Sequence, residues 1–99
     1  MRTVPISVAA AGTRVTTGAA SANVAIPNDN SANRARVVRL SVFTGSCHVR
    51  AGASAVAATN ADMMIQAGDS LLLNVHPMTH IAYIDETAGA ILLITPVER

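Results

Sequence analysis

The apolar residues of this chain recur at the period of two that is typical of β-strands. Between Arg36 and Phe43, one parity carries Val38, Leu40 and Val42, whereas the other parity mixes apolar and polar side chains. The stretch CHVRA, which follows shortly afterwards, repeats this alternation. Alternation of this kind places one face of a strand against a core and the other toward water. Both stretches are therefore predicted to be half-buried strands.

A glycine and a serine separate these two stretches, within the sequence TGSC at residues 44–47. A two-residue turn with glycine first is a common connection between antiparallel strands that pair directly. We therefore expect a β-hairpin in which His48 lies opposite Phe43 on an ordinary surface face. The expected pairs are Leu40 with Ala51, Ser41 with Arg50 and Val42 with Val49.

Three more fully apolar runs follow, at residues 70–75, 80–84 and 90–95, with turn residues such as Pro77 and Gly89 between them. These runs are also predicted to be strands. A continuous apolar run indicates that both faces of a strand are covered. The opposing sheet would cover one face, and a second subunit is a candidate cover for the other.

The first third of the chain has weaker strand signals. Residues 2–8 fit only an edge strand, because Pro5 has no N–H group to donate to a central ladder. Short strands are predicted within residues 13–17 and 23–27, and a polar loop is predicted at residues 28–35.

About eight short strands without a helical period predict an all-β fold, a small antiparallel β-sandwich or jelly roll. The length of 99 residues indicates one domain over residues 1–99. Within it, residues 1–27 are a candidate N-terminal edge or docking segment.

Composition suggests that this domain needs support from outside its own core. Hydrophobic residues make up 51% of the chain but aromatic residues only 2%, and small side chains bury little area each. A single cysteine excludes an internal disulfide. Self-association as a dimer or trimer, or docking on another protein, is therefore expected. The run of Ala, Ser, Thr and Asn at residues 53–61 is interpreted as a flat surface for such contact, because ordering small side chains costs little entropy. A plain loop is the alternative.

The charges favour a protein partner over nucleic acid. The net charge is +1, whereas binding to phosphates depends on many clustered cations. All seven basic residues are Arg, whose planar guanidinium suits carboxylates in partly buried interfaces. A coding bias of the source genome and scattered solvated charge are the alternatives. The candidate interface residues are Arg34, Arg36, Arg39 and Arg50.

No catalytic, cofactor or metal site is predicted. His76 and His80 are four residues apart, but Pro77 and the strand-turn-strand pattern argue against a helical metal site. Cys47 and His48 are neighbours on a predicted strand and so point to opposite faces, which favours a buried thiol over an activated nucleophile. The acidic residues lie in loop signals, with no spacing typical of a general acid and base.

The remaining exclusions concern carbohydrates and membranes. Phe43 and Tyr83 are the only aromatic residues. Two rings are few for a platform on which sugars or bases stack. No stretch approaches the roughly 20 apolar residues of a membrane helix. Pro5 and Ser7 interrupt the N-terminal apolar residues, so no export signal is expected and synthesis in the cytoplasm is predicted.

The C-terminal half resembles a family of small structural proteins from tailed bacteriophages. Five segments match the pattern of that family. They are Val49, Arg50, Gly52 and Ala53; an Ala/Thr-rich link from Ala55 to Thr59; Asp62, Met63, Ile65, Ala67 and Gly68; Thr79 to Ala82; and Gly89 to Pro96. The first third of the chain matches no part of the pattern.

This resemblance implies a non-enzymatic virion protein made in the host bacterial cytoplasm. The expected role is a decoration (cement) protein, which binds the outer surface of the shell formed by the major capsid protein. A head-to-tail connector or tail component of the virion is the first alternative. A carbohydrate-binding β-sandwich module is the second, from a different class of function.

Overall fold

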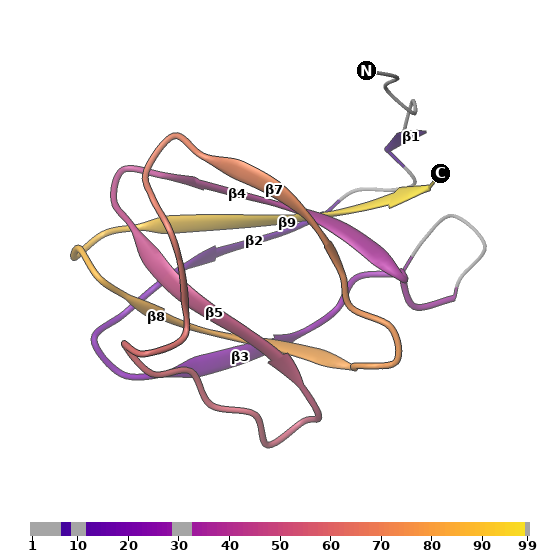
Figure 1. Cartoon of the computed structure of the whole chain (residues 1–99), viewed down its shortest axis with the longest axis horizontal. Coiled ribbons are helices and arrows are strands. Elements are labelled where there is room, and N and C mark those ends of the chain that lie inside the picture. Colours follow the sequence, from indigo (N-terminus) through magenta and orange to yellow (C-terminus); the bar gives the residue numbers. More distant parts are fainter. Residues whose placement is uncertain (1–6, 9–11, 29–32, 99) are drawn as a thin grey trace.

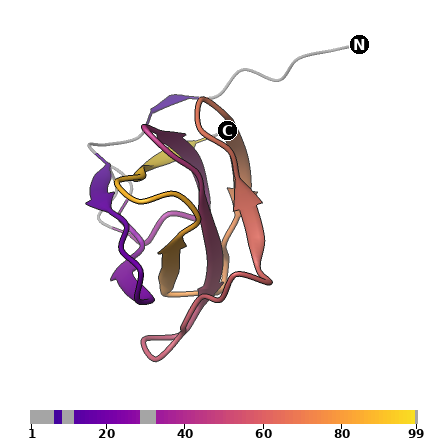
Figure 2. The ribbon, with the colours of Figure 1, turned by 90° about the vertical axis from the view of Figure 1, so that its left-hand side faces the viewer.

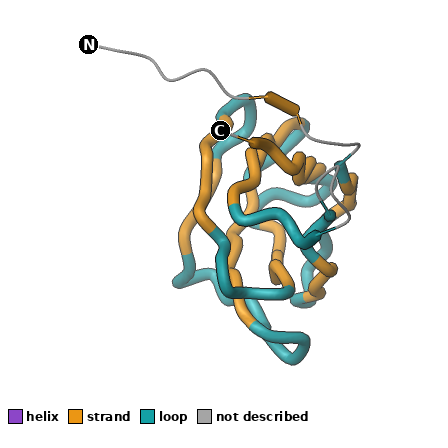
Figure 3. The backbone as a smooth tube through the Cα atoms, turned by 90° about the vertical axis from the view of Figure 1, so that its right-hand side faces the viewer, coloured by secondary structure: helices purple, strands orange, loops and turns teal. Residues whose placement is uncertain are grey.

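The computed structural model describes residues 7–8, 12–28 and 33–98, and within them it contains only strands and loops (Figure 3). The prediction of an all-β fold is therefore confirmed. The predicted role of Pro5 lies outside the described residues. The strands are β1 (Ser7–Val8), β2 (Thr13–Thr16), β3 (Ala22–Ala25), β4 (Val37–Phe43), β5 (Cys47–Gly52), β6 (Met63–Ile65), β7 (Ser70–Asn74), β8 (His80–Asp85) and β9 (Ile91–Glu98).

The strands form two antiparallel sheets in a β-sandwich-like arrangement. In sheet A, β1 and β2 follow one another along one side of β9, and β4 and then β7 lie on its other side. Sheet B has the order β3–β8–β5–β6. Figure 1 shows the strands of sheet A above β3, β5 and β8. Figure 2 shows β2 and β3 on one side of the molecule and the strands of residues 63–74 on the other.

The hydrophobic core lies between the two sheets. From β4, Val38, Leu40 and Val42 are at most 2% exposed, as the alternation predicts. Strand β5 contributes Cys47 and Val49 to the same core. Strands β8 and β9 add further large side chains, namely Ile81, Tyr83, Leu92 and Ile94.

The predicted hairpin between β4 and β5 is wrong. Strand β4 pairs with β7 and β9 in sheet A, whereas β5 pairs with β6 and β8 in sheet B. Residues 44–46 therefore cross from one sheet to the other. The Cβ that an alanine would add at Gly45 would lie 3.1 Å from Thr87 Cβ and 3.2 Å from Ala90 Cβ. The glycine is therefore needed for close approach to the β8–β9 turn.

The alternation is the same whether β4 and β5 pair as a hairpin or lie in different sheets, so it did not distinguish these two arrangements. Inward side chains of β4 and β5 meet across the core instead of side by side in one sheet. Thr44, with φ of 63°, redirects the chain, and its hydroxyl donates a hydrogen bond of 2.6 Å to the carbonyl oxygen of Gly89.

The other predicted strands overlap β2, β3, β7, β8 and β9, whereas β6 lies where alternation predicts none. Strand β2 pairs only with β9 and β3 only with β8 among the described residues, so both are edge strands. Within residues 1–27, β2 and β3 thus lie at the edges of the two sheets. The docking role of residues 1–27 remains a prediction.

Candidate protein interface

The side of sheet A that faces away from the core is defined by the pairing register. We call it the sheet A outer face. Among its described side chains only Val97, the register partner of Val37, is buried, with 5% exposed. Its positions are Arg14, Thr16, Val37, Arg39, Ser41, Phe43, Ser70, Leu72, Asn74, Ile91, Leu93, Thr95 and Val97.

This face combines partly exposed apolar side chains with two cations. Phe43, Ile91 and Leu93 lie half-buried on the neighbouring strands β4 and β9, and Leu72 on β7 is 52% exposed. The face contains Arg side chains but no carboxylate among its positions. Apolar and aromatic residues together with Arg are enriched at protein interfaces.

Both Arg side chains are held against their own sheet. The guanidinium of Arg14 lies 5.1 Å from the centroid of the Phe43 ring, a cation–π geometry. Arg39 donates a hydrogen bond of 3.0 Å from Nη2 to the hydroxyl of Ser70. Within the described residues neither guanidinium has an ion pair with a carboxylate. Their charge is therefore open to an acidic partner.

The four predicted interface residues do not share one surface. Arg34, which forms an isolated bridge with Asn28, and Arg36 are exposed just before β4. Arg39 and Arg50 are both exposed, as expected, but they belong to different sheets because the hairpin does not form. Arg50 makes an ion pair of 3.4 Å between its Nε and Asp62 Oδ1 on the sheet B side.

The outer face of sheet B is covered in part by the chain itself, while Arg50 and Met64 on that face are exposed. Residues 53–62, which we call the covering segment, leave the end of β5, cross to β3 and return to β5 before β6. Ala82 lies on this face between Arg50 and Asn23 in the register and is fully buried. The Cβ that an alanine would add at Gly52 would lie 2.7 Å from Val56, so glycine permits close approach.

Hydrogen bonds fix the covering segment at β3. The amide of Asn23 donates to the carbonyl oxygens of Ser54 and Val56, each at 3.1 Å. The backbone N–H of Ala58 donates to the hydroxyl of Ser21 at 2.8 Å, and Ala58 is 4% exposed. Within this run, Val56 and Ala58 therefore lie against the chain's own sheet B, whereas the other side chains of residues 53–61 are exposed. Contact of these exposed small residues with another protein remains a prediction.

Replacing Asn23 by Ala should loosen the covering segment. The change removes two hydrogen bonds at an exposed site, worth about 1 kcal/mol together. We expect amide hydrogen exchange in residues 53–60 to become roughly fivefold faster at constant pH, with a nearly unchanged melting temperature. The matched control is Asn74→Ala, because Asn74 also bonds backbone, the N–H of His76, but away from the segment. Equal exchange in both variants would contradict the assigned anchoring role.

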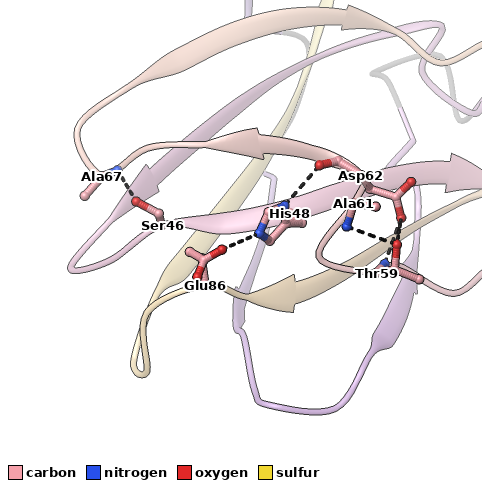
Figure 4. A network of polar contacts seen from close by, with 7 residues as sticks. All are labelled: Ser46, His48, Thr59, Ala61, Asp62, Ala67 and Glu86. Atoms are coloured by element: carbon pink, nitrogen blue, oxygen red, sulfur yellow. Dashed lines mark hydrogen bonds and ion pairs between the residues drawn. The ribbon is translucent and has the colours of Figure 1, made fainter.

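The other end of the covering segment is fixed by His48, which alternation places on an ordinary surface face. That prediction is wrong, because His48 is only 4% exposed. Figure 4 shows its ring between the covering segment and the β8–β9 turn. Ring atom Nδ1 lies 3.0 Å from the carbonyl oxygen of Asp62, and Nε2 lies 2.9 Å from Glu86 Oε1.

These contacts raise the pKa of His48. The hydrogen bond with the backbone of Asp62 is the largest cause, and the hydrogen bond with Glu86 is the second, whereas burial acts in the opposite direction. The sequence contains no spacing that links His48 with Asp62 and Glu86, since residues from three separate segments meet only in the folded chain.

The other candidate chemical groups lie apart from one another. Cys47 is fully buried in the core, and burial raises the pKa of its thiol to about 11, which keeps it protonated at neutral pH. His76 lies in the turn after β7, before a cis Pro77, and His80 begins β8. In the described part of the chain, no three potential ligands gather as a metal site would require.

The two aromatic rings also occupy different environments. Tyr83 is 9% exposed and belongs to the core, whereas Phe43 lies on the sheet A outer face beneath Arg14. The rings therefore do not form a joint stacking platform.

The last two findings concern membrane spans and the comparison with known proteins. Within residues 7–8, 12–28 and 33–98 there is no helix with the length and apolar character of a membrane span. No protein-family model, no curated protein and no solved structure matches this chain.

Proposed function

We propose that this chain is a decoration (cement) protein of a tailed-bacteriophage virion. It binds the outer surface of the shell of major capsid protein and stabilises that shell, without enzymatic activity. The observation that carries the proposal is the sheet A outer face, where Arg14 and Arg39 flank partly exposed apolar side chains and have no carboxylate partner among the described residues.

The proposed fold is a jelly roll. Support comes from the nesting of the strand pairs: β5 pairs with β6, β4 with β7, β3 with β8 and β2 with β9. The chain thus resembles one long hairpin that is wrapped so that successive pairs alternate between the two sheets. Jelly rolls with eight strands are common among capsid and lectin domains.

The opposite face of the molecule is a poorer candidate for docking. On sheet B the covering segment occupies part of the outer face, and Arg50 is already paired with Asp62. Docking through sheet A leaves this arrangement undisturbed. The favoured partner surface is apolar and carries carboxylates, which would accept charge-assisted hydrogen bonds from Arg14 and Arg39.

The residues that carry the family resemblance have structural roles here. Arg50 and Asp62 form an ion pair, Gly52 lies against Val56, and Gly68 has a φ of +88° in a turn. The resemblance therefore supports a shared fold of the C-terminal half. The docking chemistry comes from β2 and β4, outside most of the matched segments.

Stabilisation of a shell by this protein would be additive. Each copy binds the assembled lattice and not the dispersed subunits, which favours the assembled state by mass action. Self-association as a dimer or trimer would link neighbouring sites and raise the effective concentration of each contact. Modest single interfaces are then sufficient.

Replacing Arg14 and Arg39 together by Ala should weaken binding to capsid shells of the phage that carries the gene. The two residues provide the charge of the sheet A outer face, and loss of interface Arg side chains commonly costs more than about 1 kcal/mol each, so we expect at least roughly tenfold lower affinity in co-sedimentation. The matched control is Arg50→Ala, on the other sheet, which should bind as wild type. Melting temperatures of all variants check that the fold is intact.

The outcome that would contradict this assignment is wild-type occupancy by the double variant, or a loss of binding confined to Arg50→Ala. Copy number distinguishes a decoration protein from a head-to-tail connector, because a connector forms a single ring and a decoration protein is present in hundreds of copies. A count per particle that matches one ring would favour the connector.

A further inference from the structure

His48 is surrounded by hydrogen-bond acceptors at both ring nitrogens. The carbonyl oxygen of Asp62, which lies next to Nδ1, can only accept a hydrogen bond. The same is true of the ionised carboxylate of Glu86, which lies next to Nε2. A neutral imidazole carries a single N–H and can donate only once. The two contacts are therefore satisfied together only when the ring is a doubly protonated imidazolium.

The charged groups around the ring favour this cation. Glu86 approaches from the β8–β9 turn, with half of its side chain exposed, and the carboxylate of Asp62 belongs to the covering segment. Arg50 on β5 opposes them but lies against Asp62 Oδ1. The remaining neighbours on the sheet, Met64 of β6 and Ile84 of β8, bring no charge.

We infer that His48 is a protonation switch that holds the covering segment closed on sheet B. The protonated ring joins three elements: β5, the return of the covering segment at Asp62, and the β8–β9 turn at Glu86. Loss of the proton removes one of the two hydrogen bonds. The unprotonated ring nitrogen, which is buried, then faces the oxygen of Asp62 or Glu86 with no hydrogen between them, and this costs free energy. The segment then opens more often and uncovers Ala82 and the part of the outer face of sheet B that it covers. This inference does not depend on the proposed capsid role.

The sign of the pH dependence follows from the raised pKa of His48 in the closed state. Below about pH 6.5, the ordinary value for histidine, both open and closed states carry the proton and closure is strongest. As pH rises from there through the closed-state pKa, only the closed state holds the proton, and the opening constant increases by up to about tenfold per pH unit. Above that range it is constant again.

Amide hydrogen exchange of the full chain at pH 6 and pH 8, corrected for the intrinsic rate, tests this inference. The protection of the Ala58, Thr59 and Asp62 amides, which bond within or beneath the covering segment, should fall by at least about threefold at pH 8. Core amides of β4 should not change. Equal protection of the segment at both pH values would overturn the inference.

The variant Glu86→Gln gives the sharpest test. The amide of a glutamine can donate to an unprotonated Nε2 while Nδ1–H donates to Asp62, so a neutral His48 is then fully bonded. We expect the segment of this variant to stay protected at pH 8, with its pH dependence reduced to within about twofold. His76→Gln is the matched control, because His76 is exposed in the turn after β7 and takes no part in the His48 contacts, and it should keep the wild-type dependence. An unchanged pH dependence in Glu86→Gln would overturn the inference.

Nitrogen chemical shifts of the His48 ring in the wild-type chain provide a measurement that needs no variant. Both ring nitrogens should carry a proton at pH 6, and the midpoint of the His48 titration should lie above the ordinary value for histidine. A neutral ring at pH 6 would overturn the inference.

Discussion

Replacing Leu40 by Ala should lower the free energy of unfolding by about 2–5 kcal/mol. Leu40 is fully buried at the centre of β4, between its neighbours β7 and β9, and faces the core between the sheets. Truncation would remove apolar contacts and leave a cavity that strands paired on both sides cannot close. Because small domains are stable by only about 5–15 kcal/mol, this loss is a large part of the total.

Urea unfolding followed by circular dichroism measures the effect. Leu72→Ala is the matched control, because Leu72 lies on the neighbouring strand β7 but is 52% exposed, so the same truncation should change stability by less than about 1 kcal/mol. A similar loss in both variants would mean that Leu72 is buried in solution, as it would be in a self-associated form. Comparison at two protein concentrations separates this case.

Replacing Gly12 by Ala should also destabilise the fold, by about 1–3 kcal/mol. The added Cβ would overlap the carbonyl oxygen of Ile94 and lie 3.0 Å from the Cα of Thr95. Both atoms belong to the backbone of β9, which cannot move without disturbing its pairing with β2 and β4. The chain before β2 would have to shift instead, which weakens the edge of sheet A.

Gly18→Ala is the control for this change, because the added Cβ at that position meets no atom within 4 Å. Alanine lowers the conformational entropy of the unfolded chain relative to glycine. The free energy of unfolding of this variant should therefore be unchanged or higher by up to about 1 kcal/mol. Thermal unfolding of the two variants side by side gives the comparison. Equal melting temperatures would show that β2 does not dock on β9 as closely as described.

Alternation predicted which residues face the core but not which sheet they belong to. Val38, Leu40, Cys47 and Val49 all point inward as expected, because the period of two is a local property of each strand. Pairing is a tertiary property. The sequence TGSC fits a tight turn and a crossover equally well, and the two are told apart only by the pairing of β4 with β9 and of β5 with β8.

The covering segment shows a second limit of sequence interpretation. Residues 53–61 have no period and few large side chains, so nothing in them indicates which surface they contact. Because the position of this segment is not predictable, the burial of His48 is not predictable either. Its outward direction was predicted correctly, but its burial depends on the segment above it. The outward direction of Arg39 and Arg50 was likewise predictable, whereas their separation on two sheets was not.

Strand β9 is the last described strand to leave the ribosome, yet β1, β2 and β4 all pair with it. Until residues 91–98 emerge, β2 has no strand partner and β4 has only β7. Pairing between distant segments is slow, and unpaired apolar strands are prone to aggregate. Strands β1 to β8 therefore emerge before the strand that joins sheet A, and the strands of that sheet stay incompletely paired until β9 docks.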